Sequence, residues 1–195
     1  MPSHVMPRPG DTEIDVVLVD ADGRPTGTAP KLAAHRDGVL HAAVSVFVFN
    51  GRGELLLQRR AGGKYHSGGL WTNTACSHPR AGEAARDAAV RALQEEMGIR
   101  CPLEPRGVFT YRAAVGDGLV EHERDELFVG RCDDRPLPDP AEVAEVRWIS
   151  PGAVDAELRA HPERFTAWFP LAWAHVRDAS GGAFPIGIVP PGRQG

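Results

Sequence analysis

The amino-acid sequence predicts one α/β or α+β domain, in which helices pack outside a mixed β-sheet. Short runs rich in β-branched and aromatic residues alternate with longer runs whose apolar residues recur at helical spacing. The 195 residues are enough to bury a hydrophobic core, and no internal repeat divides them. Strands are expected at residues 14–19, 43–49, 54–58, 108–112, 126–130 and 146–149, and helices at residues 30–35, 83–97, 151–160 and 162–178.

The two ends of the chain differ in composition from its middle. Residues 1–12 are polar and rich in proline, and residues 179–195 are rich in glycine and proline. Segments of this kind at chain ends are commonly poorly ordered. We therefore expect a flexible N-terminal segment over 1–12, a single domain over 13–178 and a flexible tail over 179–195.

Turn signals separate the first strands. Residues 23–27 predict a turn, and Pro30 suits the first position of a short helix. After the strongly β-favouring run 43–49, Asn50 and Gly51 predict a hairpin turn, because an Asn-Gly pair readily adopts positive φ.

A long segment without periodicity, residues 59–82, precedes the main helix. Loops of this length inside a compact domain are usually functional. Within the helix a buried side is expected from Ala85, Ala89, Leu93 and Met97, with Val90, and Gly98 is suited to end the helix. The last predicted helix is expected to bend near Pro170.

Composition and charge exclude several classes of protein. The net charge of −4 argues against a general nucleic-acid or membrane binder. The longest apolar stretch, residues 42–49, is far too short to span a bilayer, and the N-terminus has no apolar run like that of a signal peptide. Cys76, Cys101 and Cys132 form no CxxC pair, which favours reduced thiols in the cytoplasm.

The most informative segment is Trp71–Pro79, where Cys76 and His78 place a thiol and an imidazole two residues apart. The helix that follows ends with the carboxylates of Glu95 and Glu96. Mg²⁺ prefers carboxylate oxygens together with substrate phosphates, so this helix suits a Mg²⁺-diphosphate group. The thiol and the imidazole suit proton transfer.

The helix carries Glu83, Arg91, Glu95 and Glu96 at a spacing that resembles the Nudix pattern. Ala92 stands where that pattern has a glutamate. Nudix hydrolases use such carboxylates to hold metal ions and activate water, so the loss indicates a Nudix fold diverted from hydrolysis. The alternative is an exposed acidic helix face held by an ion pair one turn apart.

Further motifs extend the match over most of the chain, in family order and at near-family spacing. They are Leu40-His41, Ser45–Phe47, Leu55–Ala61, Lys64–Ser67, Leu70–Asn73, Cys76–Pro79, Glu95–Gly98, Tyr111–Ala113, Glu121–Glu123 and Phe165–Trp168. On these residues the sequence resembles the type 1 isopentenyl-diphosphate isomerases, a Nudix-fold branch that interconverts isopentenyl and dimethylallyl diphosphates. The resemblance implies a Nudix-like mixed β-sheet sandwiched by helices.

The resemblance also implies a metal site of three histidines and two glutamates. The matching positions are His35, His41, His78, Glu121 and Glu123. This mixture of nitrogen and oxygen ligands suits Mn²⁺, Zn²⁺ or Mg²⁺. Glu121 and Glu123, two apart on a strand, would face the same side. The remaining histidines are assigned to the surface or the core: His4, His66, His122, His161 and His175.

Catalytic roles follow from the same resemblance. Cys76 and Glu123 would flank the double bond from opposite faces, one protonating an alkene carbon and the other removing an allylic proton. A water-excluding pocket would protect the tertiary carbocation between them. Tyr111 and Trp168 would stabilise that cation through their π faces, and Tyr111 would assist the proton relay. A thiolate at Cys76 would need nearby positive charge, and plain core packing stays open for Trp168.

The diphosphate needs positively charged partners. Lys31, Arg60 and Lys64 match family positions that contact it, through charge-assisted hydrogen bonds. A second Mg²⁺ would bridge the diphosphate and Glu96. Arg91 is expected to brace the helix carboxylates rather than touch the substrate.

Four features depart from the family pattern. Ala92 stands where the isomerases commonly have Arg, so one diphosphate contact is missing. Ala42 replaces a frequent Arg, and Gly68 replaces a proline, which makes its loop more flexible. The interval between His35 and His41 is slightly short, which makes His35 the least secure ligand. Candidates to replace the missing contact are Arg24, Arg80 and Arg112.

The sequence therefore predicts a cytoplasmic, monomeric isomerase that acts on isopentenyl and dimethylallyl diphosphate in isoprenoid biosynthesis, without nucleic-acid or membrane partners. A Nudix-type diphosphate hydrolase is the main alternative, although Ala92 counts against it. A non-catalytic prenyl-diphosphate-binding relative is another, but it would have no need of Cys76 and Glu123. A structural zinc domain fits poorly, because Cys101 and Cys132 lack paired spacing.

Overall fold

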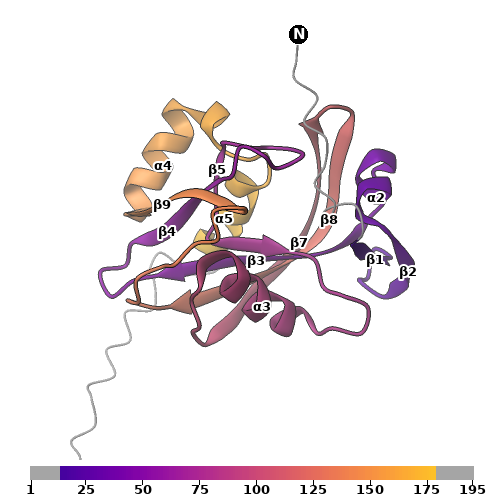
Figure 1. Ribbon diagram of the computed structural model, residues 1–195, viewed down its shortest axis with the longest axis horizontal. Helices are drawn as coiled ribbons and strands as arrows, with labels where there is room; N and C mark the ends of the chain where they lie inside the picture. The colour runs from indigo at the N-terminus through magenta and orange to yellow at the C-terminus, as the bar shows by residue number, and fades with distance from the viewer. Residues whose placement is uncertain (1–13, 179–195) are drawn as a thin grey trace, which may run out of the picture.

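The computed structural model describes residues 14–178 of the chain (Figure 1). The strands within these residues belong to one mixed β-sheet. They are β1 (Asp15–Val19), β2 (Pro25–Pro30), β3 (His41–Phe49), β4 (Leu55–Arg60), β5 (Trp71–Thr72), β6 (Ala75–Ser77), β7 (Leu103–Gly116), β8 (Leu119–Arg131) and β9 (Val143–Ile149). The helices are α2 (Lys31–Asp37), α3 (Ala85–Met97), α4 (Pro151–Ala160), α5 (Phe169–Asp178) and the short 3₁₀ helix η1 (Pro162–Arg164).

Strand β3 lies at the centre of the sheet. Strand β8 runs parallel to it along its whole length, and β7 pairs with the far edge of β8. The other edge of β3 is shared, because β1, β6 and β4 pair with it in turn from His41 to Phe49. Residues of β6 and β8 therefore lie on opposite edges of the same central strand.

Helices cover both faces of the sheet, as Figure 1 shows with α3 on one side and α4 and α5 on the other. Phe47 and Leu57 point to the second side and pack with Phe169 and Trp173 of α5. The alternate residues of the strands point to α3, since successive side chains of a strand face opposite ways. On that side Val44, Val46, Val48 and Leu56 pack with Ala88, Ala89, Ala92, Leu93 and Met97. Val90, expected on the buried side of this helix, is exposed. The prediction of a mixed sheet sandwiched by helices is confirmed.

Several predicted elements are confirmed with changed boundaries. Helix α3 begins two residues later than predicted and ends at Met97, where Gly98 adopts φ 65° and closes the helix on the carbonyl of Gln94. The hairpin turn after β3 is present, but the positive φ belongs to Gly53. Asn50 acts through its side chain instead, because its Oδ1 accepts from the backbone N–H groups of Arg52 and Glu54.

Other predictions are wrong. The turn-rich segment after residue 23 turns at Gly23 but continues as strand β2, with Pro25 at the edge-strand position that proline tolerates. Residues 59–82 contain β5 and β6, both too short to show periodicity. The strands expected at 108–112 and 126–130 are present, but they are longer than predicted and form a long hairpin, because the polar residues around them also belong to the ladder.

Residues 162–178 form two helices rather than one bent helix. The chain leaves η1 at Phe165, whose φ and ψ are extended, and Trp71 pairs with it as an isolated bridge. Pro170 lies in the first turn of α5, where a proline is tolerated because its missing N–H has no helical partner. None of the helices within residues 14–178 combines the length and the hydropathy of a membrane-spanning segment. The predicted flexible ends lie outside the described residues.

Candidate active site

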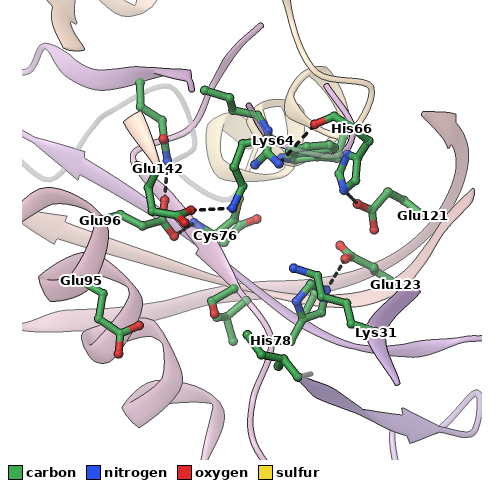
Figure 2. Close-up of a pocket in the computed structure, with 18 of the residues that line it drawn as sticks. Lys31, Lys64, His66, Cys76, His78, Glu95, Glu96, Glu121, Glu123 and Glu142 are labelled. Carbon is green, nitrogen blue, oxygen red and sulfur yellow. Dashed lines mark hydrogen bonds and ion pairs between the residues drawn. The ribbon is translucent and has the colours of Figure 1, made fainter. Parts of the chain in front are cut away.

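A pocket of about 390 Å³ opens between α2, the centre of the sheet and α3. Figure 2 shows two groups of side chains in it. Glu96, Glu142 and Lys64 gather beside Cys76, while Glu121, Glu123, His66 and His78 lie at the other side. Most of the predicted site residues line this pocket: Lys31, Arg60, Lys64, Cys76, His78, Glu96, Tyr111, Glu121, Glu123 and Trp168.

The structure brings together the five side chains expected to bind a metal. One potential ligand atom from each lies within 4.8 Å of all the others: these residues are His35, His41, His78, Glu121 and Glu123. The short interval between His35 and His41 is no obstacle, because Gly38 ends α2 with φ 62° and turns the chain directly into β3. The rings of these two histidines lie 4.8 Å apart.

Backbone carbonyls orient two of the imidazoles. Nδ1 of His35 lies 2.6 Å from the carbonyl oxygen of Lys31, and Nδ1 of His41 lies 2.8 Å from that of Val39. A carbonyl only accepts, so each Nδ1 carries a proton, and in the neutral form of each ring Nε2 keeps its lone pair. Both Nε2 atoms are buried and make no hydrogen bond of good geometry among the described residues, but they lie 3.1 Å from Oε2 of Glu121 and 3.5 Å from Oε1 of Glu123, respectively. Such atoms fit a divalent cation, because neutral imidazole nitrogen is a common metal ligand.

The electrostatics of the cluster act differently on its members. Burial lowers the pKa of His41, but contacts with Glu123 raise it overall, whereas both carboxylates are held in the charged form that metal ligands need. Burial opposes ionisation of Glu121, but the imidazoles of His35 and His66 hold its pKa well below the usual range. Burial and Glu121 oppose ionisation of Glu123, yet contacts with His41 and His78 lower its pKa as well. Burial lowers the pKa of His78 to about 4, so this ring is neutral.

His66 belongs to the site although the sequence assigned it to the surface or the core. Its Nε2 lies 3.1 Å from Oε1 of Glu121, and its ring stacks 5.8 Å from that of His35. Burial lowers the pKa of His66. Its sequence position could have indicated a place in the site, because the loop between β4 and β5 that carries His66 also carries Lys64.

Glu123 connects the cluster of histidines and glutamates to the expected acid/base groups. Its Oε1 lies 2.9 Å from Nε2 of His78, and its Oε2 accepts a hydrogen bond of 2.6 Å from the hydroxyl of Tyr111. Burial and the neighbouring carboxylates raise the pKa of Tyr111, so that hydroxyl keeps its proton. The pair therefore couples a carboxylate to a phenol inside the pocket.

Cys76 lies on the other edge of β3 from Glu123. It pairs with Ser45 in the β3–β6 ladder, whereas Glu123 pairs with His41 in the β3–β8 ladder. Burial and Glu96 raise the pKa of the Cys76 thiol, and Arg60 only partly opposes them. This environment favours the neutral thiol, which holds a proton, over a thiolate.

Glu96 is buried beside this thiol. Gln58 donates a hydrogen bond of 2.6 Å from Nε2 to Oε2 of Glu96, and the backbone N–H of Cys76 donates one of 3.2 Å to Oε1. Burial raises the pKa of Glu96 to about 7, against the effect of Gln58. The contact with Gln58 was not foreseen, since nothing in the sequence pairs residues 38 positions apart.

The three expected diphosphate contacts have different surroundings. Nζ of Lys31 lies 5.4 Å from the centre of the Tyr65 ring, and the guanidinium of Arg60 lies 5.4 Å from that of Trp168. Nζ of Lys64 contacts a carboxylate oxygen of Glu142 at 2.8 Å. Cationic groups from α2, β4 and the following loop thus face one pocket.

Trp168 serves the core and the pocket together. It belongs to the apolar cluster on the α5 side of the sheet, and its indole also lines the pocket. Its Nε1 donates to Oδ1 of Asn73 at 3.3 Å, and Nδ2 of Asn73 donates to the carbonyl of Ala75 at 2.7 Å. The neighbouring Trp173 packs in the same cluster, as predicted.

The departures from the family pattern fall in different places. Ala92 is 1% exposed and packs in the core, outside the pocket lining. Arg80 does line the pocket, whereas Arg24 and Arg112 are not among the described residues that line it. A Cβ at Gly68 would lie 2.9 Å from the carbonyl oxygen of Gly62, so the backbone approaches closely there. No other amino acid fits this position without a local shift.

Arg91 braces the acidic end of the site, as the sequence predicted. Its guanidinium donates to both carboxylate oxygens of Glu83, at 2.8 and 2.9 Å, and to Glu95 at 3.2 Å. It also donates to the backbone carbonyl of His78 at 3.1 Å. These contacts tie α3 to the segment between β6 and α3, next to the strand that carries Cys76.

Comparison with known proteins gives the family. A model of the NUDIX domain matches residues 39–169. The chain is 48% identical over 164 residues to the isopentenyl-diphosphate Delta-isomerase of Pectobacterium atrosepticum, covering 84% of this chain and 92% of the relative. It is 46% identical over 172 residues to the protein of that name from Nocardia farcinica, covering 85% of this chain and 98% of the relative.

Solved structures agree on the fold. A crystal structure from Deinococcus radiodurans superposes with a TM-score of 0.69 at 19% identity, covering 84% of this chain and 98% of that chain. A MutT protein from Methanosarcina mazei has a TM-score of 0.60 at 18% identity, covering 71% and 94% of the two chains. With this fold, and with relatives that match over most of their length, the chain belongs to the isopentenyl-diphosphate Delta-isomerase family of NUDIX-domain proteins.

Proposed function

We propose that this protein interconverts isopentenyl diphosphate and dimethylallyl diphosphate. The observation that carries the proposal is one pocket in which Cys76 and Glu123 enter from opposite edges of β3. Moving the double bond requires one proton to be added to the terminal alkene carbon and another to be removed from the allylic carbon. Cys76 and Glu123 enter the pocket from opposite edges of β3, and these two sides are here called its Cys76 wall and its Glu123 wall. One group can add a proton while the other removes one, and the substrate need not turn over between the two steps.

The reaction at the Glu123 wall would use Glu123 and Tyr111 as a unit. The phenol donates to the carboxylate at 2.6 Å, so a proton taken up or released by Glu123 can be shared with Tyr111. On the other wall the protonated thiol of Cys76 is the partner. The indole of Trp168 offers a π face to the tertiary cation that forms between them.

A divalent cation fits the cluster of His35, His41, His78, Glu121 and Glu123. The support is the pair of buried Nε2 atoms of His35 and His41, which point at two carboxylates of lowered pKa. Mn²⁺, Zn²⁺ and Mg²⁺ all suit this donor set. When bound, the cation would neutralise the carboxylates and hold Glu123 in place for proton transfer.

The diphosphate would lie at the end of the pocket that holds Glu96. Lys31, Arg60 and Lys64 supply positive charge for its oxygens. Glu96 would hold a Mg²⁺ shared with the diphosphate, since carboxylate and phosphate oxygens are the ligands that Mg²⁺ prefers. The role of each of these residues, a cytoplasmic location and a monomeric state are predictions from the sequence.

Phosphorus NMR of a reaction with isopentenyl diphosphate and Mg²⁺ separates this function from diphosphate hydrolysis. An isomerase converts one diphosphate into another and releases no phosphate. Released phosphate or monophosphate would identify a hydrolase. Unchanged substrate, under conditions in which binding is demonstrated, would identify a non-catalytic prenyl-diphosphate binder.

A further inference from the structure

Gln58 is a polar residue of β4, in the middle of the sheet, and its side chain forms hydrogen bonds with groups outside that strand. It is 1% exposed, and it pairs with Thr72 of β5 on one side and with Val146 of β9 on the other. Leu56 and Arg60 share its face of β4, because side chains two apart on a strand point the same way. Leu56 packs in the core and Arg60 lines the pocket, so Gln58 lies at the boundary between them.

Both hydrogens of the Gln58 amide have partners. Nε2 donates to Oε2 of Glu96 at 2.6 Å and to the backbone carbonyl of Thr74 at 3.1 Å. The first bond is short, as expected for a donor to a carboxylate. The second joins β4 to the residue just before β6, the strand that carries Cys76. One amide therefore ties together β4, β6 and α3.

Glu96 extends this connection to the backbone of the thiol. Its Oε1 accepts the N–H of Cys76 at 3.2 Å, so each carboxylate oxygen has one fixed donor. A carboxylate oxygen can accept more than one contact, which leaves a lone pair on each for the pocket. Without the Gln58 donor the carboxylate of Glu96 could rotate, and the lone pairs of Oε2 would no longer point in a fixed direction.

We propose that Gln58 is a positioning residue, which orients the Glu96 carboxylate toward the Mg²⁺ of the diphosphate and, through Glu96, holds the backbone at Cys76. This inference rests on the proposed role of Glu96 in binding Mg²⁺. Partners that orient a metal ligand typically change metal affinity by about 10- to 100-fold when they are lost. Gln58 is suited to this task because β4 is paired on both edges and cannot easily move.

Two substitutions of nearly equal size test the proposal. Gln58→Glu replaces the donor by a carboxylate that repels Glu96, and Gln58→Met removes the hydrogen bond without adding charge. Gln94→Glu is the matched control, because Gln94 lies on the same helix but contacts Arg100 at the surface. If the buried charge prevents Gln58→Glu from folding, the neutral variant Gln58→Met still tests the proposal.

The main readout is the dissociation constant of inorganic diphosphate at a fixed Mg²⁺ concentration, measured by calorimetry without turnover. We expect it to rise about tenfold or more in the Gln58 variants and to stay within about twofold in Gln94→Glu. The Mg²⁺ concentration that gives half-maximal isomerisation should rise in parallel. The metal content of the His/Glu cluster should not change, because Gln58 contacts none of its members.

Glu96→Gln, measured alongside, separates this inference from the proposed function. If Glu96→Gln weakens Mg²⁺-dependent diphosphate binding but a folded Gln58→Met binds like the parent protein, the positioning role of Gln58 is wrong. If Glu96→Gln itself binds Mg²⁺ and diphosphate like the parent protein, the proposed role of Glu96 is wrong and the inference for Gln58 is wrong with it.

Discussion

The hydroxyl of Tyr111 donates a hydrogen bond of 2.6 Å to Oε2 of Glu123, and both side chains are buried. A hydrogen bond to a charged group contributes about 1.5–3 kcal/mol. Tyr111→Phe should therefore lower kcat by about 10- to 100-fold while the affinity for diphosphate is kept. The fold should survive, since the ring of Tyr111 stacks on Phe109 at 5.5 Å and phenylalanine preserves that contact.

Steady-state kinetics with isopentenyl diphosphate give kcat and KM for this variant. A rise in KM without loss of kcat would assign Tyr111 to substrate binding and would contradict a role in the proton relay.

Removal of a histidine from the His/Glu cluster should lower metal content. His41→Ala and His78→Ala each delete one of the five potential ligand atoms of the cluster. The loss in affinity should exceed the about 10- to 100-fold typical of losing a supporting hydrogen bond. Metal per protein is measured by mass spectrometry after dialysis at low metal concentration.

His161→Ala is the control for these variants, because His161 is exposed and contacts only the exposed Glu163 among the ion pairs of the described residues. An unchanged metal content in His41→Ala and His78→Ala would exclude the proposed cluster as a metal site.

Arg80 is expected to take part of the role left open by Ala92. It lines the pocket beside the acidic end of α3, but its side chain is 66% exposed. Exposed charge pairs contribute at most about 1 kcal/mol, so Arg80→Ala should raise KM by up to about fivefold with kcat nearly unchanged. Arg24→Ala is the control, since Arg24 contacts Asp22 away from the pocket. Equal KM values for the two variants would remove Arg80 from the diphosphate site.

The ion pair of Glu83 and Arg91 should make stability depend on pH in the acid range. The hydrogen bonds from Arg91 lower the pKa of Glu83 to about 2 from its ordinary value of 4.5. A lowered folded-state pKa contributes stability that is complete above the unfolded pKa and is lost as pH falls through the folded one. The contribution is therefore present above pH 4.5 and disappears toward pH 2.

Urea unfolding of the parent protein and Glu83→Gln between these pH values measures the effect. The difference between the urea midpoints of the parent protein and Glu83→Gln should become smaller as pH falls. The difference between the parent protein and Glu163→Gln, a substitution at an exposed position, should show no such trend. A difference independent of pH would contradict the assigned pKa.

Sequence reasoning located residues whose motifs are local and missed those whose partners are distant. Cys76 and His78 stand in one short segment, and the family resemblance supplied their companions. Ser45 donates a buried hydrogen bond of 2.7 Å to Asp125, which lies 80 residues later in the sequence, and no sequence pattern predicts this contact. The contact between Gln58 and Glu96 could not be predicted for the same reason.

The fold was predictable where periodicity is strong and not where it is weak. Helix α3 has a clear apolar side and a terminal Gly98, so its existence and end were predicted correctly. The long hairpin of β7 and β8 was underpredicted, because charged residues such as Glu121 and Glu123 stand where apolar residues usually mark a buried strand face. Strands β5 and β6 depend on pairing with β4 and β3 rather than on their own sequence.

The most direct test of the central claim is a reaction with isopentenyl diphosphate and Mg²⁺ in D₂O, followed by proton and deuterium NMR. The parent protein should form dimethylallyl diphosphate with deuterium in the new methyl group, and Cys76→Ala and Glu123→Gln should each abolish this exchange. Cys101→Ala, which changes a thiol outside the pocket lining, should behave like the parent protein. Full exchange in either Cys76→Ala or Glu123→Gln, or product without deuterium from the parent protein, would contradict proton transfer between Cys76 and Glu123.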